Sequence, residues 1–539
     1  PLGFRQYQCV DLIKRRAAGT DELTQAVEAL AHEHAPTKDS LRSPVRSRSS
    51  SSTMWVLGIS IIALATIAFL IWRPWGATGA SPVVAVVPVE QTPATRAISR
   101  KLLVQLGTLE AAKTESMTLV ESSSGDHDLR LEVGWSDNSE GSQAQLALIE
   151  ARDSSLLWSG TFSAARGRGA DLEQQLAFTA AQVLSCAFEA LAEEPRLSQQ
   201  VVKLYLSACR QLDDLTYGEY RQLIPAFRQV TELAPGFAGG WAKMLQAEAL
   251  AWLLGPRDKG LGQSLKGDIL KARKVNPHMA EAYLAQAHMT PQWQYAERFR
   301  LLDLAIRENP SHPLSFATRS YYLRQIGRMD ESVDNAKRAA ELDPLSPVRR
   351  YDFIVALTYA GLFDRARQEI NRAARLWPGS SIVAEARYRF NARYGDPKEA
   401  LQYLNSSGPV SQSRSADAFL RARLSPTPAA IDAAIKEGQR EYRSGPEGIF
   451  ILVETLGEFD READLKPILL NWAQPDMVGR LAEVLFRPTL EELRYDPLFM
   501  RIAQRLQLIR YWRNADKWPD FCSEPQLPYD CRKEAAIYN

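Results

Sequence analysis

The residues of this chain best placed to do chemistry are its cysteines, because no constellation of catalytic side chains can be recognised. The chain has six histidines among 539 residues, and its predicted α/β part has neither a glycine-rich phosphate loop nor a serine nucleophile elbow. Catalysis needs acid, base or nucleophile residues that converge on one place. We therefore expect no enzymatic activity and no cofactor. We also expect no metal site, since the sequence has no Cys-x-x-Cys pair with a supporting histidine.

Four of the five cysteines lie beyond residue 180 and fall into two pairs. Cys522 and Cys531 flank a proline-rich segment with little regular structure, and a disulfide between them would fix that segment. We predict this bridge. Cys186 and Cys209 lie on successive predicted helices, which would bring the two sulfurs together if the helices pack antiparallel. The alternative for this second pair is two buried small apolar residues, and the sequence leaves both open.

The helices expected between residues 197 and 510 carry an internal repeat. Pro310, Pro344 and Pro378 recur at a spacing of 34 residues. The windows that end at the last two prolines share a turn glycine, a large apolar residue, small alanines and a helix-ending proline, which is the tetratricopeptide (TPR) pattern. The signature positions are Gly327, Ala339 and Pro344 in the first window and Gly361, Phe363, Ala366, Ala373 and Pro378 in the second.

Stacked repeats of this kind form a curved solenoid, and the first helix of each hairpin lines its concave groove. Tyr and Arg are the residue types that most often anchor protein interfaces. By register, the candidates for the groove are Tyr321, Arg324, Tyr351, Tyr359, Arg389 and Arg393. The alternative is that several of them simply pack on the adjacent repeat. The array therefore predicts a protein or peptide partner, bound in the groove.

A second organising feature is the uncharged apolar stretch 54–72. A run of this length spans a bilayer as a helix, because its backbone groups bond internally. Its N-terminal flank carries four basic residues between Lys38 and Arg48, and the more positive flank stays in the cytoplasm. The alternative, a cleavable signal peptide, would lie nearer the N-terminus. We therefore predict a single transmembrane helix with residues 1–53 in the cytoplasm.

The predicted fold class is mostly α, with a single transmembrane helix, a small α/β domain and a TPR α-solenoid. Apolar and polar residues alternate in segments such as 128–135 and 155–163, which predicts the strands of the α/β domain. The last segment is expected to cap the solenoid. The predicted parts are a short cytoplasmic helical segment (1–36), a disordered Ser/Arg linker (37–53), the transmembrane helix (54–72), the α/β domain (82–193), the TPR-like helical repeats (197–510) and a C-terminal cap with the Cys522–Cys531 loop (511–539).

This order of parts resembles the membrane-integrated bacterial transcriptional regulators of the CadC type. The resemblance is carried by VVAVVPVEQ (83–91), LLWSGTFS (156–163), the two best repeats, and the tail segments YWR, WPDFC and LPYDC. It implies that the α/β domain is similar to the N-terminal domain of TolB. It also implies a bacterial inner-membrane protein whose bulk lies in the periplasm. Those regulators carry a cytoplasmic winged helix-turn-helix, which is longer than the 53 residues that precede the apolar stretch here.

Nucleic acid is not an expected partner of this chain as given. The helix expected at 21–33 has four acidic residues and no Lys or Arg, a charge poorly suited to DNA. The chain as a whole is balanced, with 65 basic and 64 acidic residues. It therefore has no global field that would attract a polyanion.

Two function classes remain from the sequence. The first is an inner-membrane-anchored periplasmic TPR protein that binds a protein or peptide partner as a scaffold or as a sensor module. The alternative is a membrane-integrated one-component transcriptional regulator whose DNA-binding winged helix is truncated or absent here. A single membrane helix transmits little by bending, so association of two chains into a homodimer is the form of signalling that we consider.

Overall fold

The structure, a computed structural model, divides the chain into two units, Pro1–Gly79 and Ala80–Asn539. The described residues all lie in the second unit. They are 82–110, 117–121, 126–212, 220–255, 259–406, 413–472 and 477–538. The predicted cytoplasmic segment (1–36), linker (37–53) and transmembrane helix (54–72) lie outside these described residues.

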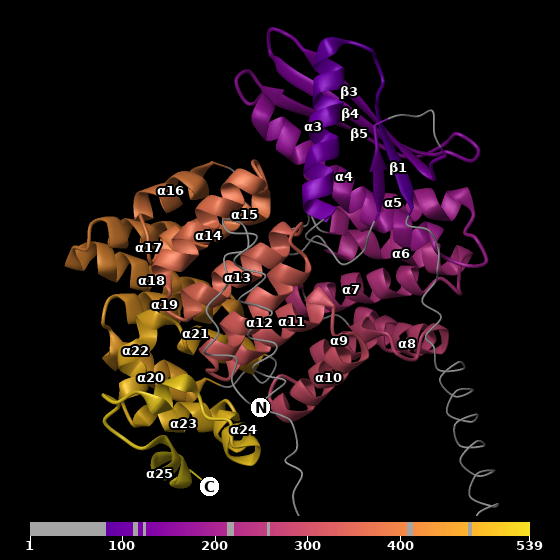
Figure 1. The fold of residues 1–539 in the computed structure, drawn as a ribbon. Helices are drawn as coiled ribbons and strands as arrows, with labels where there is room; N and C mark the ends of the chain where they lie inside the picture. The colour runs from indigo at the N-terminus through magenta and orange to yellow at the C-terminus, as the bar shows by residue number, and fades with distance from the viewer. Residues whose placement is uncertain are drawn as a thin grey trace, which may run out of the picture. The chain divides into compact units, whose positions relative to one another are not determined.

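Residues 83–165 contribute a sheet that lies beside α3 (Pro93–Glu110) and α4 (Gly169–Leu191) (Figure 1). It has five strands in the order β2-β1-β3-β4-β5. The strands are β1 (Val83–Pro88), β2 (Thr118–Val120), β3 (Leu129–Asp137), β4 (Gly141–Glu150) and β5 (Ser155–Ala165). β1 pairs in parallel with β2 and β3, whereas β3, β4 and β5 are antiparallel neighbours. The short β2 and the long β5 are therefore the two edge strands.

Three helices contact this sheet. α3 contacts β1 and β3, α4 contacts β4 and β5, and α5 (Gln199–Leu212) also contacts β5. Successive side chains of a strand point to opposite faces, so the side chains of β3 alternate between the core and a more open face. The fully buried residues of β3 are Leu129, Leu131 and Val133. They share one hydrophobic cluster with residues of α3 and α4.

The chain is helical from residue 199 onward. The first six of these helices are α5 (Gln199–Leu212), α6 (Tyr220–Leu233), α7 (Ala238–Leu254), α8 (Lys259–Val275), α9 (Ala280–Met289) and α10 (Tyr295–Glu308). Three further hairpins follow, formed by α11 (Pro313–Gln325) with α12 (Met329–Leu342), α13 (Pro347–Tyr359) with α14 (Phe363–Leu376), and α15 (Ser381–Arg393) with α16 (Pro397–Asn405). Their first helices begin at 313, 347 and 381 and their second helices at 329, 363 and 397, a spacing of 34 residues. The prediction of a TPR-like helical solenoid is therefore confirmed.

The signature residues explain why these hairpins form. Gly327 and Gly361 occupy the turn between the two helices of a hairpin, with φ of +80° and +70°. A left-handed backbone of this kind favours glycine, because other residues place their Cβ against the following carbonyl. The small residues let the two helices approach closely, and those with no exposed surface are Ala339, Ala366 and Ala373. Phe363 stacks on the ring of Tyr394, with centroids 4.5 Å apart.

The remaining helices first continue the array and then return to its middle. They are α17 (Arg414–Leu424), α18 (Pro428–Ser444), η1 (Pro446–Gly448), α19 (Ile449–Glu458), α20 (Glu462–Asn471), α21 (Val478–Leu485), η3 (Pro488–Leu490), α22 (Glu491–Tyr495), α23 (Leu498–Arg505), α24 (Leu508–Ala515), η4 (Asp520–Ser523) and α25 (Cys531–Ala536). α21 contacts α11 and α24 contacts α10. Apolar side chains of α9–α11 and of the helices from α19 onward form one buried cluster. The structure thus places the segment 511–539 against this middle part of the array.

The helices in the described part of the chain are all too short or too polar to cross a membrane. Among these helices α4 is the longest, with 23 residues, and it carries Asp171, Glu173 and Glu189. Charged side chains are costly in the hydrocarbon region of a bilayer. This finding corrects the predicted fold class, which included a transmembrane helix, and the predicted single-pass inner-membrane localisation.

Candidate functional site: the inner face of the helical array

The six predicted groove residues lie on the first helices of three consecutive hairpins. Tyr321 and Arg324 are on α11, Tyr351 and Tyr359 on α13, and Arg389 and Arg393 on α15. None of the six is fully exposed. The inner face on which they lie contacts helices from the C-terminal part of the same chain, and these contacts define the site.

Arg324 is the centre of the first set of contacts. Its Nε lies 2.8 Å from Oε1 of Glu483, which comes from α21. The guanidinium also lies 5.5 Å from the ring centroid of Tyr321 and 5.4 Å from that of Tyr359. Burial would lower the pKa of Arg324, but Glu483, Tyr359 and Asp352 together more than offset this and raise it. A buried cation is therefore balanced by a carboxylate and by two aromatic faces.

Glu454 of α19 is the centre of the second set. Its side chain is 3% exposed, and its Oε2 accepts hydrogen bonds from Nη2 of Arg393 at 3.0 Å and from Nη1 of Arg487 at 2.8 Å. Arg487 also donates from Nε to the hydroxyl of Tyr359 at 3.0 Å. Burial alone would raise the pKa of Glu454, but Arg393 and Arg487 hold it below its usual value. The carboxylate is therefore charged and held between two guanidinium groups.

The other two predicted groove residues, Arg389 and Tyr351, differ in their surroundings. Arg389 donates from Nε to Oε1 of Glu385 at 2.6 Å, one turn earlier on the same helix. The charge of Arg389 also lowers the pKa of Glu454, but by less than the charges of Arg393 and Arg487 do. Tyr351 is 5% exposed and belongs to the main hydrophobic cluster. Whether any of the six binds a partner is untested and stays a prediction.

The turn between α11 and α12 is covered by the C-terminal segment. Nε1 of Trp512 donates to the carbonyl of Ile326 at 3.0 Å, and the backbone N–H of Asp520 donates to the carbonyl of Gly327 at 3.0 Å. Nη1 of Arg328 donates to the carbonyl of Trp518 at 2.8 Å. These bonds and the buried aromatic side chains around them make the C-terminal segment part of the inner face of the array.

A buried arginine joins α9, α10 and α11 next to this site. Arg298 is 1% exposed and donates to the backbone carbonyls of Ala287, Thr290 and Gln292. Its guanidinium lies 4.3 Å from the ring centroid of Tyr322. The amide oxygen of Gln292 in turn accepts from the backbone N–H of Gly479, at the start of α21. The arginine therefore organises the surface on which the C-terminal helices dock.

His288 lies in the same buried region, and its Nδ1 is 2.7 Å from the hydroxyl of Tyr322. Burial lowers the pKa of His288 to about 3, and the positive charge of Arg298 adds to this. The imidazole is therefore neutral at ordinary pH and serves as a hydrogen-bonding core residue. The described part of the chain holds no group of three or more His, Cys, Asp or Glu residues arranged to bind a metal ion.

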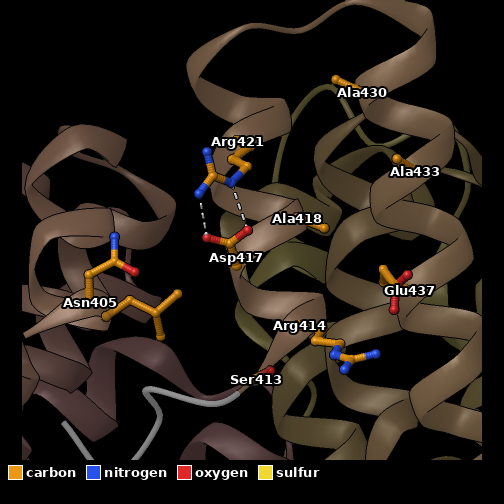
Figure 2. A pocket seen from close by; sticks show the side chains of 10 residues that line it. Asn405, Ser413, Arg414, Asp417, Ala418, Arg421, Ala430, Ala433 and Glu437 are labelled. Atoms are coloured by element: carbon orange, nitrogen blue, oxygen red, sulfur yellow. Dashed lines mark hydrogen bonds and ion pairs between the residues drawn. The ribbon is translucent and has the colours of Figure 1, made fainter. Parts of the chain in front are cut away.

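A cavity lies away from the inner face, between α16, α17 and α18 (Figure 2). Its volume is about 540 Å³. The residues that line it are Leu404, Asn405, Ser413, Arg414, Asp417, Ala418, Arg421, Ala430, Ala433 and Glu437. Arg421 is paired with Asp417, with Nε to Oδ2 at 2.7 Å. Arg414 is exposed and makes no ion pair with the described residues, so its charge is available to a ligand.

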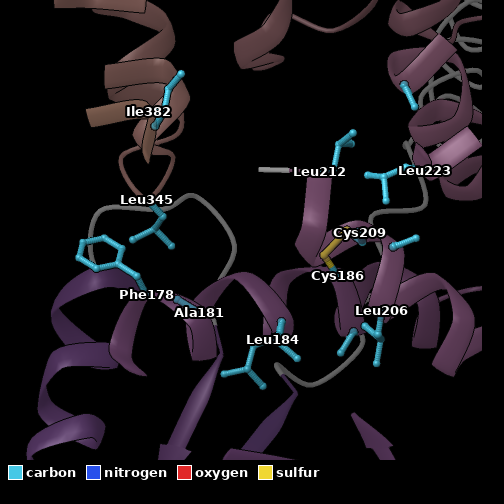
Figure 3. Packing of buried hydrophobic residues seen from close by; sticks show 14 of the residues in the cluster. Phe178, Ala181, Leu184, Cys186, Leu206, Cys209, Leu212, Leu223, Leu345 and Ile382 are labelled. Atoms are coloured by element: carbon cyan, nitrogen blue, oxygen red, sulfur yellow. A yellow bond between two sulfur atoms is a disulfide. The ribbon is translucent and has the colours of Figure 1, made fainter. Parts of the chain in front are cut away.

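Both pairs of distal cysteines are disulfide-bonded. Cys186 of α4 is joined to Cys209 of α5, with 6.4 Å between the Cα atoms (Figure 3). Cys522 of η4 is joined to Cys531 of α25, with 5.7 Å between the Cα atoms. The second bridge is the one that the sequence predicts. For the first pair, the antiparallel arrangement of the two helices decides between the alternatives that the sequence leaves open.

The hairpins and their filled inner face define a TPR-like helical solenoid that carries a small α/β domain. No family model and no curated protein matches the chain. Among solved structures, the chain is similar to the crystal structure of yeast Tom70, with a TM-score of 0.31 and 14% identity. The match covers 62% of this chain and 75% of that chain. A similarity this low carries no argument about function, and no comparison supports the resemblance to CadC-type regulators.

Proposed function

We propose that this chain is a non-enzymatic scaffold that binds a peptide segment of a protein partner. The observation that carries the proposal is the array of helical hairpins at a 34-residue spacing, since stacked hairpins present extended surfaces for partners. The transcriptional-regulator alternative is not proposed, because no contact among the described residues favours it.

The cavity between α16, α17 and α18 is the binding site that we assign to the partner. The inner face, by contrast, is filled by aromatic side chains of the chain's own C-terminal helices, whose removal would expose a large buried cluster. The cavity combines an apolar floor, formed by Leu404 and three alanines, with the exposed charge of Arg414. A pocket of this composition suits an apolar side chain that is followed or preceded by a carboxylate.

The test is a selection of peptides from a random library displayed on phage, carried out against the folded full chain. We expect apolar peptides with an acidic residue to be enriched. Ala433→Trp should fill the cavity and weaken their binding at least about tenfold, because the peptide loses its pocket. Ala429→Trp is the matched control, since Ala429 is also exposed on α18 but does not line the cavity.

The outcomes of this selection test the scaffold proposal and the choice of the cavity separately. If no peptide prefers the folded chain to the urea-unfolded chain, the scaffold proposal is wrong. If enriched peptides bind Ala433→Trp as well as they bind the wild-type chain, the cavity is not the partner site. Arg414→Gln should remove the preference for acidic peptides and leave the apolar preference in place.

A further inference from the structure

The strand β5 is a long open edge of the sheet. It runs over Ser155–Ala165 and pairs only with β4, on one side. No backbone group of the described residues bonds to the other side of this strand between Leu156 and Ala164. Ser159, Thr161 and Ser163 are exposed along it. α5 also contacts β5, but it makes no backbone bond to this edge, so the stretch from Leu156 to Ala164 offers a row of unpaired N–H and C=O groups to another strand.

This edge also lacks the usual protection against pairing. Edge strands of monomeric proteins are commonly short, or they carry charges, prolines or bulges. The other edge strand, β2, has only three residues. By contrast, the 11 residues of β5 include no charged residue and no proline. The one irregularity in its pairing with β4 lies near its start, opposite Leu148 and Ile149.

The sequence of β5 is complementary to itself when two copies run antiparallel about Gly160. In that register Trp158 of one copy lies opposite Phe162 of the other, and Ser159 lies opposite Thr161. Aromatic pairs and pairs of hydroxyl residues both stabilise neighbouring strands. No charged residue meets a like charge, because the strand has none. A two-fold axis at Gly160 would make the interface isologous, as in most homodimers.

The local packing of β5 places the rings of Trp158 and Phe162 on the same face of the strand, as this arrangement requires. A Cβ added to Gly160 would lie 2.7 Å from the ring of Trp158 and 3.1 Å from that of Phe162. Both rings therefore lean over Gly160 on the same face of the strand. Trp158 is only half-buried, and Leu156 is 46% exposed, so apolar surface is left beside the open edge. A second strand there would cover it.

From these observations we propose that β5 pairs antiparallel with β5 of a second copy of this chain, about a two-fold axis at Gly160. The two five-stranded sheets then join into one continuous sheet. This interface is separate from the cavity between α16, α17 and α18, so it does not rest on the proposed scaffold function.

The first test is the mass of the purified full chain by sedimentation over a range of concentrations. We expect a dimer that dissociates on dilution. Thr161→Lys should weaken it roughly tenfold, because each dimer gains two lysines at the paired edge. Gln145→Lys is the matched control. Gln145 pairs with Thr161 in the β4–β5 ladder and is exposed on the same face, one strand away from the edge.

The second test fixes the register by disulfide trapping, with Cys9 replaced by Ser and the native bridges left oxidised. The double variant Ser159→Cys with Thr161→Cys places two cysteine pairs opposite each other across the axis and should form a covalent dimer. Ser159→Cys alone should not, because its partner position holds a threonine. A covalent dimer of the single variant would show that the two-fold axis lies elsewhere, and the proposed register would then be wrong.

Two results would overturn the proposal as a whole. The first is a chain that stays monomeric at every concentration. The second is a dimer that both lysine variants leave unchanged and that the double cysteine variant does not trap, since this dimer would use another surface. Peptide binding to the cavity is measured independently of both.

Discussion

At the scale of single residues, the most unusual group is a buried acidic pair between α6, α7 and α8. Glu248 and Asp268 have 0% and 2% exposed side chains. Nη2 of Arg228 donates to both carboxylates, at 2.6 and 3.1 Å, and also to Ser264. Lys271 also donates from Nζ to Oδ1 of Asp268 at 3.0 Å, so Asp268 has a second cation, whereas Glu248 shares Arg228 with it. Burial and the neighbouring Asp268 raise the pKa of Glu248 to about 7, despite the opposing effect of Arg228.

This raised pKa predicts a loss of stability as the pH rises. The folded chain favours the protonated form of Glu248, so the contribution is complete below pH 4.5 and is lost as the pH passes through about 7. We expect the free energy of unfolding to fall by up to about 3 kcal/mol over that interval. Urea unfolding at several pH values measures it. Glu248→Gln should flatten the slope, whereas Glu232→Gln, at an exposed position on α6, should leave it unchanged.

Glu454 behaves in the opposite way, because its pKa is held low and its charge is needed. Glu454→Gln would leave Arg393 and Arg487 buried without their counter-charge. We expect a loss of about 3 kcal/mol or more in the free energy of unfolding. Glu462→Gln is the control, since its pair with Lys466 lies near the surface and should change stability by less than about 1 kcal/mol. Equal effects of the two substitutions in urea unfolding would show that the buried network contributes little.

At the scale of elements, the two best repeats differ in what covers their turns. Gly327 and Gly361 occupy the same position with similar positive φ. A Cβ on Gly327 would lie 2.5 Å from Pro519 of the C-terminal segment and 2.7 Å from Phe486, which follows α21. A Cβ on Gly361 would meet no atom within 4 Å. A comparison of the two glycines therefore distinguishes two reasons for glycine: the left-handed turn that both repeats need, and the close contact with the C-terminal segment that only Gly327 makes.

Alanine at these two glycines should have clearly different costs. Gly361→Ala should destabilise the chain by about 1 kcal/mol, which is the cost of a left-handed backbone for a residue with a Cβ. Gly327→Ala should cost about 2 kcal/mol more, because the overpacked C-terminal segment must also shift. Chemical denaturation of both variants measures the difference. Costs that agree within error would mean that the segment gives way without strain.

The periodic elements could be predicted from the sequence, and the filled inner face could not. Pro310, Pro344 and Pro378 recur because each hairpin uses the same local sequence pattern. That pattern is enough to predict where the helices lie. Arg324 and Glu483 are 159 positions apart, and Arg393 and Glu454 are 61 apart. No local pattern pairs such residues, because the contact exists only once the C-terminal helices have folded back. For the same reason, the groove residues were identified by register without the carboxylates that they contact.

At the scale of the whole described unit, α4 joins the sheet to the helical array. One side of α4 packs on β4 and β5. Phe178 on the same helix lies 5.1 Å from the ring of Trp377, at the end of α14, and clusters with Leu345 and Ile382 (Figure 3). The disulfide from Cys186 to Cys209 fixes α4 to the first helix of the array. Because α4 packs on both the sheet and the array, the two parts cannot separate without exposing buried side chains of α4.

We therefore expect the sheet and the array to unfold together. Dyes attached to Ser136→Cys on β3 and to Lys337→Cys on α12, both exposed positions, should report one common midpoint in urea when Cys9 is replaced by Ser. Phe178→Ala should lower the free energy of unfolding by about 3 to 5 kcal/mol, because it removes a buried aromatic side chain from the joint. Since that side chain serves both parts, both dyes should report the same shift. Two separate midpoints, or a shift at only one dye, would mean that α4 belongs to the sheet alone.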